Sequence, residues 1–208
     1  MARLLLIISF ALFTSACSTS PTNNFYILTA NSSANSVTKN AENNSTSNTK
    51  VDDENSVNKS VVGVGPITVP DYLQRSPIAY SMTNNHLIVS SVDQWSEPLD
   101  KAIGRVMAVN LSRLYPSRST LTFPWRIESK PQFAIRISII ELNRQSVDQA
   151  VLEADWTLVD IKKRQVLHRA RFSQMIRTSE FSYANLAYAY SDLLAMLSHT
   201  IDKVLQSY

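Results

Sequence analysis

The sequence predicts an α+β fold, in which a mixed or antiparallel sheet carries two helices packed on one face. Three observations favour this class. Strand-like segments lie before and after a first helical pattern, and a second helical pattern closes the chain. The 208 residues suit one domain, and 44% of them are hydrophobic, which is enough for a globular core.

Short strands are predicted in the first half of the chain. The segment 61–69 is mostly apolar and contains a Gly65-Pro66 pair, which is typical of a bulge or bend within a strand. Further candidates follow at 78–82 and 86–92.

Two helices are predicted where apolar residues recur every three or four positions. The first begins just after Ser96, whose hydroxyl is expected to cap it, and stops before Pro116. The second runs from about 181 to 206 with one apolar stripe along its length. Each helix therefore has one face to bury against the sheet.

Three later segments alternate between apolar and polar residues, as half-buried strands do: 133–139, 152–158 and 166–172. The short polar link at 162–165 favours an antiparallel hairpin between the last two. The alternation places His168 on the inward face of its strand. A hydrogen-bonded core histidine is expected there rather than a catalytic base.

Residues 1–16 are typical of an export signal peptide: a positive charge, an apolar stretch of ten residues and small residues before Cys17. Ten residues span about 15 Å as a helix, half of a bilayer core of about 30 Å. Cys17 is the only cysteine, and its position resembles the lipobox of bacterial lipoproteins, in which this residue is lipidated. An ordinary signal peptide cut after Ala16, or a free buried cysteine, remain the alternatives.

Residues 31–60 form a composition break with eight Asn and seven Ser. The segment has too little apolar surface to offset its ordering entropy, so we predict a disordered insert. The apolar run 25–28 before it has strand-like composition. If this run is the first strand of the domain, residues 17–24 form a tether of about 25 Å, and otherwise the tether is about forty residues long. The main domain is expected at 61–208.

Candidate chemistry is weak throughout the chain. The net charge of +3 and the pI of 9.0 are too mild to indicate nucleic acid as a partner. One cysteine excludes an intrachain disulfide, and the three histidines lack metal-ligand spacing to one another. No Gly-x-Ser-x-Gly or complete dinucleotide motif occurs. We therefore predict no catalytic residue, cofactor or metal site.

Three short motifs follow one another between residues 61 and 116: Val69-Pro70-Asp71-Tyr72-Leu73 at a strand end, Trp95-x-x-Pro98-Leu99 at a helix start, and Ala108-x-Asn110-Leu111-Ser112 at a helix end. Together with the cysteine and the run at 25–28, these motifs resemble the PqiC family. Its members are auxiliary lipoproteins of ABC-type and MCE-type transport. The resemblance covers nearly the whole mature chain except 31–60.

The resemblance implies a non-enzymatic part in moving lipids across the periplasm. The implied partners are an MCE-domain tunnel protein and an inner-membrane component, and the protein itself could assemble into a homo-oligomeric ring. Ser18 follows the lipidated cysteine, and by resemblance to enterobacterial lipoproteins it implies the periplasmic side of the outer membrane.

The candidate partner-binding residues are Asp71, Tyr72 and Leu73 at the corner after the first long strand, together with Trp95. The corner either displays Tyr72 and Leu73 to a partner or closes the core, and Trp95 is expected to pack with Pro98 at the helix start. The competing function is a stand-alone periplasmic lipid-binding or carrier lipoprotein. Such a carrier needs an internal cavity of roughly several hundred Å3, whereas a docking protein needs an exposed patch.

Overall fold

A computed structural model describes residues 22–30, 60–82, 85–178 and 180–208. The predicted signal peptide, Cys17 and nearly all of the predicted insert lie outside these ranges. The elements, in chain order, are β1 (Asn24–Tyr26), β2 (Val61–Thr68), the 3-10 turn η1 (Asp71–Leu73), β3 (Pro77–Met82), β4 (His86–Trp95), α2 (Leu99–Leu114), β5 (Ser119–Thr122), the 3-10 turn η2 (Ile127–Ser129), β6 (Phe133–Ser146), β7 (Gln149–Asp160), β8 (Gln165–Arg177) and α3 (Tyr183–Leu205).

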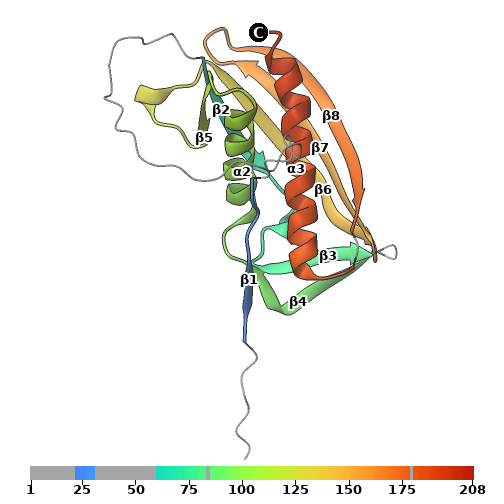
Figure 1. Ribbon diagram of the computed structural model, residues 1–208. Coiled ribbons are helices and arrows are strands. Elements are labelled where there is room, and N and C mark those ends of the chain that lie inside the picture. Colours follow the sequence, from blue (N-terminus) through green and yellow to red (C-terminus); the bar gives the residue numbers. More distant parts are fainter. Residues whose placement is uncertain (1–21, 31–59, 83–84, 179) are drawn as a thin grey trace, which may run out of the picture.

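The main sheet has five strands in the order β5-β2-β6-β7-β8, and α2 and α3 lie side by side on one of its faces (Figure 1). The β5, β2 and β6 strands are parallel, whereas β6, β7 and β8 are antiparallel neighbours. The sheet is therefore mixed, which confirms the predicted α+β class. The antiparallel β7–β8 pair also confirms the hairpin predicted at 162–165.

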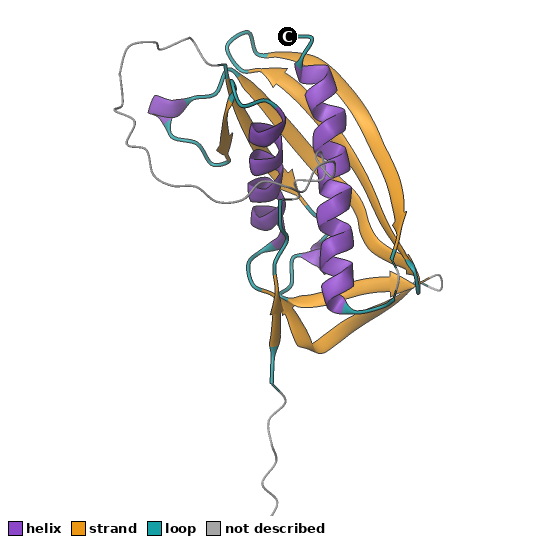
Figure 2. Ribbon diagram, viewed as in Figure 1, coloured by secondary structure: helices purple, strands orange, loops and turns teal. Residues whose placement is uncertain are grey.

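A second sheet of three strands, β1-β4-β3, lies at one end of the main sheet (Figure 2). A single sheet was expected from the sequence, and the separate three-stranded sheet corrects that expectation. The reason is that β1 and β4 pair in parallel although residues Asn24 and Asp93 are far apart in the sequence. Local alternation carries no information about such a partner.

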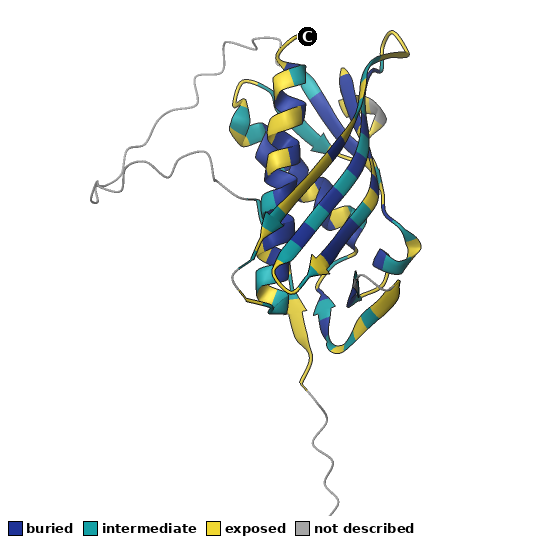
Figure 3. Cartoon of the chain, turned by 90° about the vertical axis from the view of Figure 1, so that its right-hand side faces the viewer, coloured by how far each residue is buried: buried dark blue, intermediate teal, exposed yellow. Residues whose placement is uncertain are grey.

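The core fills the space between the two helices and the main sheet. Alternate β6 residues such as Ile135 and Ile137 point inward, and Trp156 of β7 and Tyr190 of α3 are buried almost completely. Figure 3 shows the buried residues (dark blue) where helices and strands face each other, whereas β1 projects as an exposed strand. The expected bulge at the Gly65-Pro66 pair is confirmed by a register shift between Val64 and Ile67.

One local expectation was wrong. Ser96 does not cap the first helix: α2 begins at Leu99 behind Pro98, and the Ser96 hydroxyl donates to the carbonyl oxygen of Tyr26 instead. His168 lies on the inward face of its strand, as expected, because it pairs with the buried Leu158. Its side chain is half-buried and lies on Trp156, with ring centroids 5.0 Å apart.

The alternation in β8 is interrupted next to His168. A register shift in the β7–β8 pairing leaves Leu167 as the extra residue, and this residue packs against the core. Val166 is thereby turned outward and is 48% exposed. The residues after this irregularity, His168, Ala170 and Phe172, lie on the predicted inward face, and only Val166 before it lies on the opposite face. The sequence alternation could not reveal this one-residue irregularity.

Candidate functional site

The strand β1 is held at its outer end by the buried carboxylate of Asp93 in β4. The side chains of Asn24, Tyr26 and Ser90 all donate hydrogen bonds to this carboxylate, at 3.0, 3.0 and 2.8 Å. Burial alone would raise the pKa of Asp93, but the three hydrogen bonds outweigh this effect and hold the pKa below its usual value. The ionised form of Asp93 therefore stabilises the attachment of β1.

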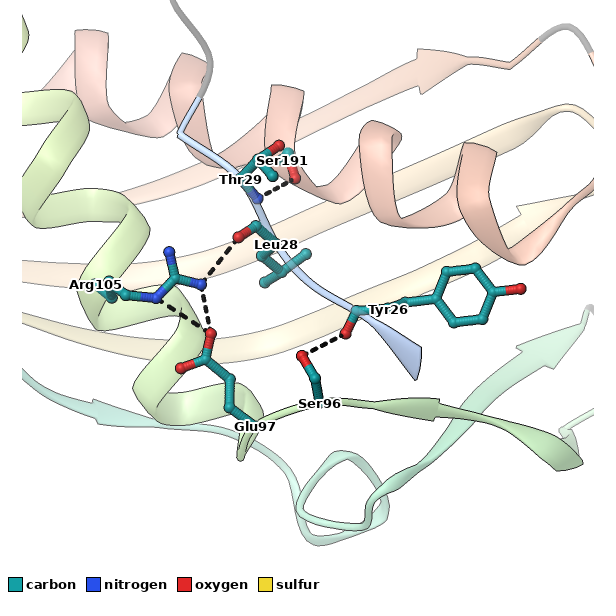
Figure 4. A network of polar contacts seen from close by, with 7 residues as sticks. All are labelled: Tyr26, Leu28, Thr29, Ser96, Glu97, Arg105 and Ser191. Carbon is teal, nitrogen blue, oxygen red and sulfur yellow. Dashed lines mark hydrogen bonds and ion pairs between the residues drawn. The ribbon is translucent and has the colours of Figure 1, made fainter. Parts of the chain in front are cut away.

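The chain that continues from β1 passes between the two helices, and both helices bind its backbone (Figure 4). Arg105 of α2 donates to the carbonyl oxygen of Leu28 at 3.0 Å. Thr29 donates its backbone N–H to the hydroxyl of Ser191 in α3, also at 3.0 Å. Glu97 pairs with Arg105 and fixes its guanidinium in place.

Further contacts close the attachment on either side. Arg113 of α2 donates to the carbonyl oxygen of Ala30 at 2.9 Å. At the other side, the carbonyl oxygen of Tyr26 accepts from both the backbone N–H and the hydroxyl of Ser96, at 2.9 and 3.0 Å. We call residues 24–30 together with these polar partners the N-terminal clamp. Side chains from β4, α2 and α3 hold this continuous segment of the chain.

The side chains of the N-terminal segment alternate between core and solvent. Tyr26 packs against the core and Leu28 is fully buried within it. In contrast, Phe25 is 63% exposed and Ile27 is 55% exposed. Two large apolar side chains therefore face solvent at the point where the chain enters the domain. Exposed apolar residues in such a position are candidates for contact with another surface.

The four candidate partner-binding residues divide between the surface and the core. Asp71 is exposed and Tyr72 is half-buried in η1, whereas Leu73 is only 2% exposed. Burial and the charge of Glu141 raise the pKa of Tyr72. Trp95 is buried and stacks on Tyr190 of α3, with ring centroids 6.1 Å apart.

The Asp71–Leu73 corner and Trp95 therefore do not form one exposed patch. Leu73 and Trp95 join the core and hold η1 and β4 against the helices. Trp95 stacks on Tyr190 of α3, a partner that the sequence did not indicate. Of these four residues, only Asp71 and the outer part of Tyr72 face solvent for another molecule.

Sequence reasoning missed Asp93, Arg105 and Ser191, which make the principal contacts of the clamp. Asp93 offered one signal, since it is an acidic residue in a segment that otherwise reads as a strand. Ser191 is a small hydroxyl residue within an apolar helical stripe. Its hydroxyl donates to the carbonyl oxygen of Ala187, so it already has a hydrogen-bond partner within its own helix. Neither feature of the sequence identifies the partner, because the bound segment, residues 24–30, is far away in the sequence.

The arrangement suits attachment and positioning of the N-terminal segment. Across the described residues, no group of three His, Cys, Asp or Glu side chains lies close enough to hold a metal ion. Within the same ranges, no helix is both long and apolar enough to cross a membrane. The contacts that do converge are hydrogen bonds to a single strand of backbone.

The fold and the clamp together define a small α+β domain whose two helices bind the segment that follows its own N-terminal strand. The chain belongs to the family of ABC-type transport auxiliary lipoprotein components, whose pattern matches residues 45–202. This membership confirms the family that the motifs between residues 61 and 116 resemble.

Named relatives point in the same direction. The intermembrane transport lipoprotein PqiC of Escherichia coli (strain K12) is 24% identical over 99 residues, which are 46% of this chain and 49% of that protein. The protein of the same name from Shigella flexneri matches to the same extent. The chain thus aligns with about half the length of these relatives.

Solved structures share the fold. The crystal structure of an uncharacterised protein superimposes with a TM-score of 0.66 at 16% identity, covering 89% of this chain and 99% of the other. Protein XCC0632 from Xanthomonas campestris gives a TM-score of 0.57 at 13% identity, covering 69% and 81%. At these identities the likeness concerns the fold.

Proposed function

We propose that the protein is a non-catalytic component of an MCE-type intermembrane lipid transport system, anchored by lipidated Cys17 to the periplasmic side of the outer membrane. The observation that carries this proposal is the N-terminal clamp. It fixes the chain only seven residues after Cys17, so the tether reaches about 25 Å at most. The domain then stays close to the bilayer instead of moving freely on a long linker.

Membership in an auxiliary lipoprotein family supports the anchor, and the names of the PqiC relatives support intermembrane transport. Two or three acyl chains hold a protein on a bilayer almost irreversibly, whereas one chain is marginal. Firm anchoring suits a protein that works by contact. Its proposed partners are an MCE-domain tunnel protein and an inner-membrane component, and several copies could form a ring around the tunnel.

The anchor is tested by metabolic labelling with a palmitate analogue followed by membrane fractionation. We expect the natural chain to be labelled and to sediment with outer membranes. The Cys17→Ala variant should lose the label and leave that fraction. An unlabelled natural chain would overturn the anchor.

The partnership is tested by crosslinking in cells and mass spectrometry of the captured proteins. Recovery of an MCE-domain protein supports the proposal. Recovery of lipid without any MCE-domain protein would favour the alternative, a stand-alone lipid carrier. The two functions thus predict different captured molecules from one experiment.

A further inference from the structure

An open groove lies on the face of the main sheet that is turned away from the helices. Its floor is a row of apolar neighbours on three adjacent strands: Ala134 of β6 pairs with Val159 of β7, which pairs with Val166 of β8. Ala134 and Val159 are buried, and Val166 is the exposed member of the row. Its wall is formed by Phe123 and Trp125, whose rings meet edge to face with centroids 5.1 Å apart. The groove is open to solvent and has a volume of about 590 Å3. This volume is within the usual size range of small-molecule sites.

The aromatic wall is built into the fold by a glycine. A Cβ atom at Gly63 of β2 would lie 2.7 Å from the indole of Trp125 and 2.7 Å from the ring of Pro131. Only a residue without a side chain lets these rings rest directly on the sheet. Trp125 is therefore a fixed part of the groove.

Three cations line the same groove: Lys130, Arg136 and Arg164. All three are exposed, and none pairs with a carboxylate in the part of the chain that the structure describes. Arg171 on the same sheet face behaves differently, because it pairs with Glu153 and Asp155. The groove thus concentrates positive charge that the protein itself does not neutralise.

Arg164 adopts a conformation that a glycine or asparagine adopts more readily. Its φ of 54° lies in the left-handed region, which is uncommon for a residue with a long side chain. Arg164 is the last residue of the turn between β7 and β8, where a left-handed residue is common, so this conformation sets the path of the turn beside the groove. Here the side chain supplies one of the three unpaired cations.

From this chemistry we propose that the sheet groove binds a single-chain anionic amphiphile. Its headgroup lies on Lys130, Arg136 and Arg164, and its alkyl chain lies along the exposed apolar side chains of Val166 and Phe123. A peptide strand suits the floor less well, because the backbone groups of the paired strands beneath it are already used within the sheet. An alkyl chain needs no hydrogen bonds.

The position of the groove favours one bound molecule over a membrane surface. Lys130 and Arg164 also line an adjoining cavity together with Tyr208, the last residue. This end of the domain lies opposite β1, where the chain enters (Figure 1). The choice of one bound molecule over a membrane surface rests on the proposed function, because the end that carries β1 faces the bilayer only if Cys17 is lipidated. The groove and its cations do not depend on that anchor.

The test uses the full chain with Cys17→Ala, so that no covalent acyl chain competes. Lysophosphatidylglycerol is titrated below its micelle concentration by calorimetry, beside lysophosphatidylcholine of equal chain length and inorganic phosphate. We expect the anionic lipid to bind more tightly than both. Its tryptophan fluorescence change should be lost in Trp125→Phe, because Trp95 and Trp156 are buried.

Two variants test the cations. Arg136→Gln and Arg164→Gly should each weaken binding by about threefold to tenfold. Arg164→Gly removes the strained conformation, so it should keep or raise the unfolding temperature while affinity falls. Lys203→Gln, an exposed cation in the last turn of α3, is the matched control and should change nothing. Equal affinity for the two lipids, unchanged binding in both groove variants, or binding of a polyglutamate peptide instead of lipid would each overturn the proposal.

Discussion

The roles of several residues in this protein depend on the hydrogen-bond partners that the fold brings to them from distant parts of the sequence. Asp93 is an acidic side chain that is 6% exposed, and it is retained because Asn24, Tyr26 and Ser90 satisfy its oxygens. Asn110 is also buried, at 3% exposure, but its amide has no hydrogen-bond partner in the described residues. The two positions predict opposite effects on substitution.

The pKa of Asp93 is lowered in the folded protein, so the charged form stabilises the fold above the ordinary value of 3.8. This contribution is complete at neutral pH and is lost as the pH falls from about 4 through the lowered pKa. Asp93→Asn should therefore cost about 1–2 kcal/mol at pH 7, through weakened hydrogen bonds to a charged group. Denaturant unfolding between pH 7 and pH 2.5 should show the two proteins converging, and a constant difference would contradict this role.

Replacing Asn110 with Leu should stabilise the protein by about 1 kcal/mol, because a buried amide without a partner costs more than an apolar side chain. Denaturant unfolding of Asn110→Leu measures the change. Asn110→Ala is the companion variant, since it removes the amide but leaves a small cavity. A large loss of stability in Asn110→Leu would indicate that the amide has a partner such as an ordered water.

At the scale of the element, β1 is the part of the fold that depends most on distant residues. It has only three residues and one neighbouring strand, and its attachment continues through Leu28 and Thr29 to both helices. A strand this short has little intrinsic stability. Its place in the fold is set by the buried Leu28 side chain and by the polar contacts of the clamp.

We expect Arg105→Gln to loosen the segment without unfolding the domain. Hydrogen exchange of residues 24–30 should become at least about fivefold faster, which corresponds to about 1 kcal/mol for a lost charged hydrogen bond. Lys101→Gln is the matched control, because Lys101 lies on the same helix and is exposed. Uniform acceleration across the whole domain would mean that Arg105 supports global stability instead.

The sequence predicted elements well where burial follows a local period. Both helices and the three long strands lie within a few residues of the expected positions, although β6, β7 and β8 extend further than the alternation indicated. The β5 strand was missed because Ser119–Thr122 has no clear alternation. The parallel pairing of β1 with β4 was missed because it depends on contacts between residues about seventy positions apart.

Residue-level function was harder to predict for the same reason. The motifs identified the family, and they also drew attention to Leu73 and Trp95. Both side chains prove to be core residues. The polar contacts of Asp93, Arg105 and Ser191 could not be predicted from the sequence, because each is made with the distant N-terminal segment. A pattern within one element shows which face is buried, but it does not show what that face meets.

Across the whole molecule, the clamp and the groove lie on different sides of the main sheet. The clamp lies between the two helices, and the groove lies on the sheet face turned away from them. The β1 strand, with exposed Phe25 and Ile27, projects at one end of the domain. The two sides can meet different surfaces, which allows their roles to be separated by mutation.

Phe25 and Ile27 are two exposed apolar side chains within the N-terminal clamp. Phe25→Ser combined with Ile27→Ser should leave the unfolding temperature within about 2 °C, because both side chains are already largely in water. Membrane fractionation should also be unchanged, since the acyl anchor at Cys17 would remain. Crosslinking to neighbouring copies or to the proposed MCE-domain partner should fall severalfold, because an exposed apolar contact is removed.

Tyr188→Ser provides the comparison for this variant. Tyr188 of α3 is 63% exposed, the same fraction as Phe25, but it belongs to the helix and not to the entering chain. Crosslinking should persist in this variant if the surface beside the clamp makes the contact. Equal losses in both variants would instead show that exposed apolar area in general supports assembly, and equal retention would show that β1 serves only to hold the chain.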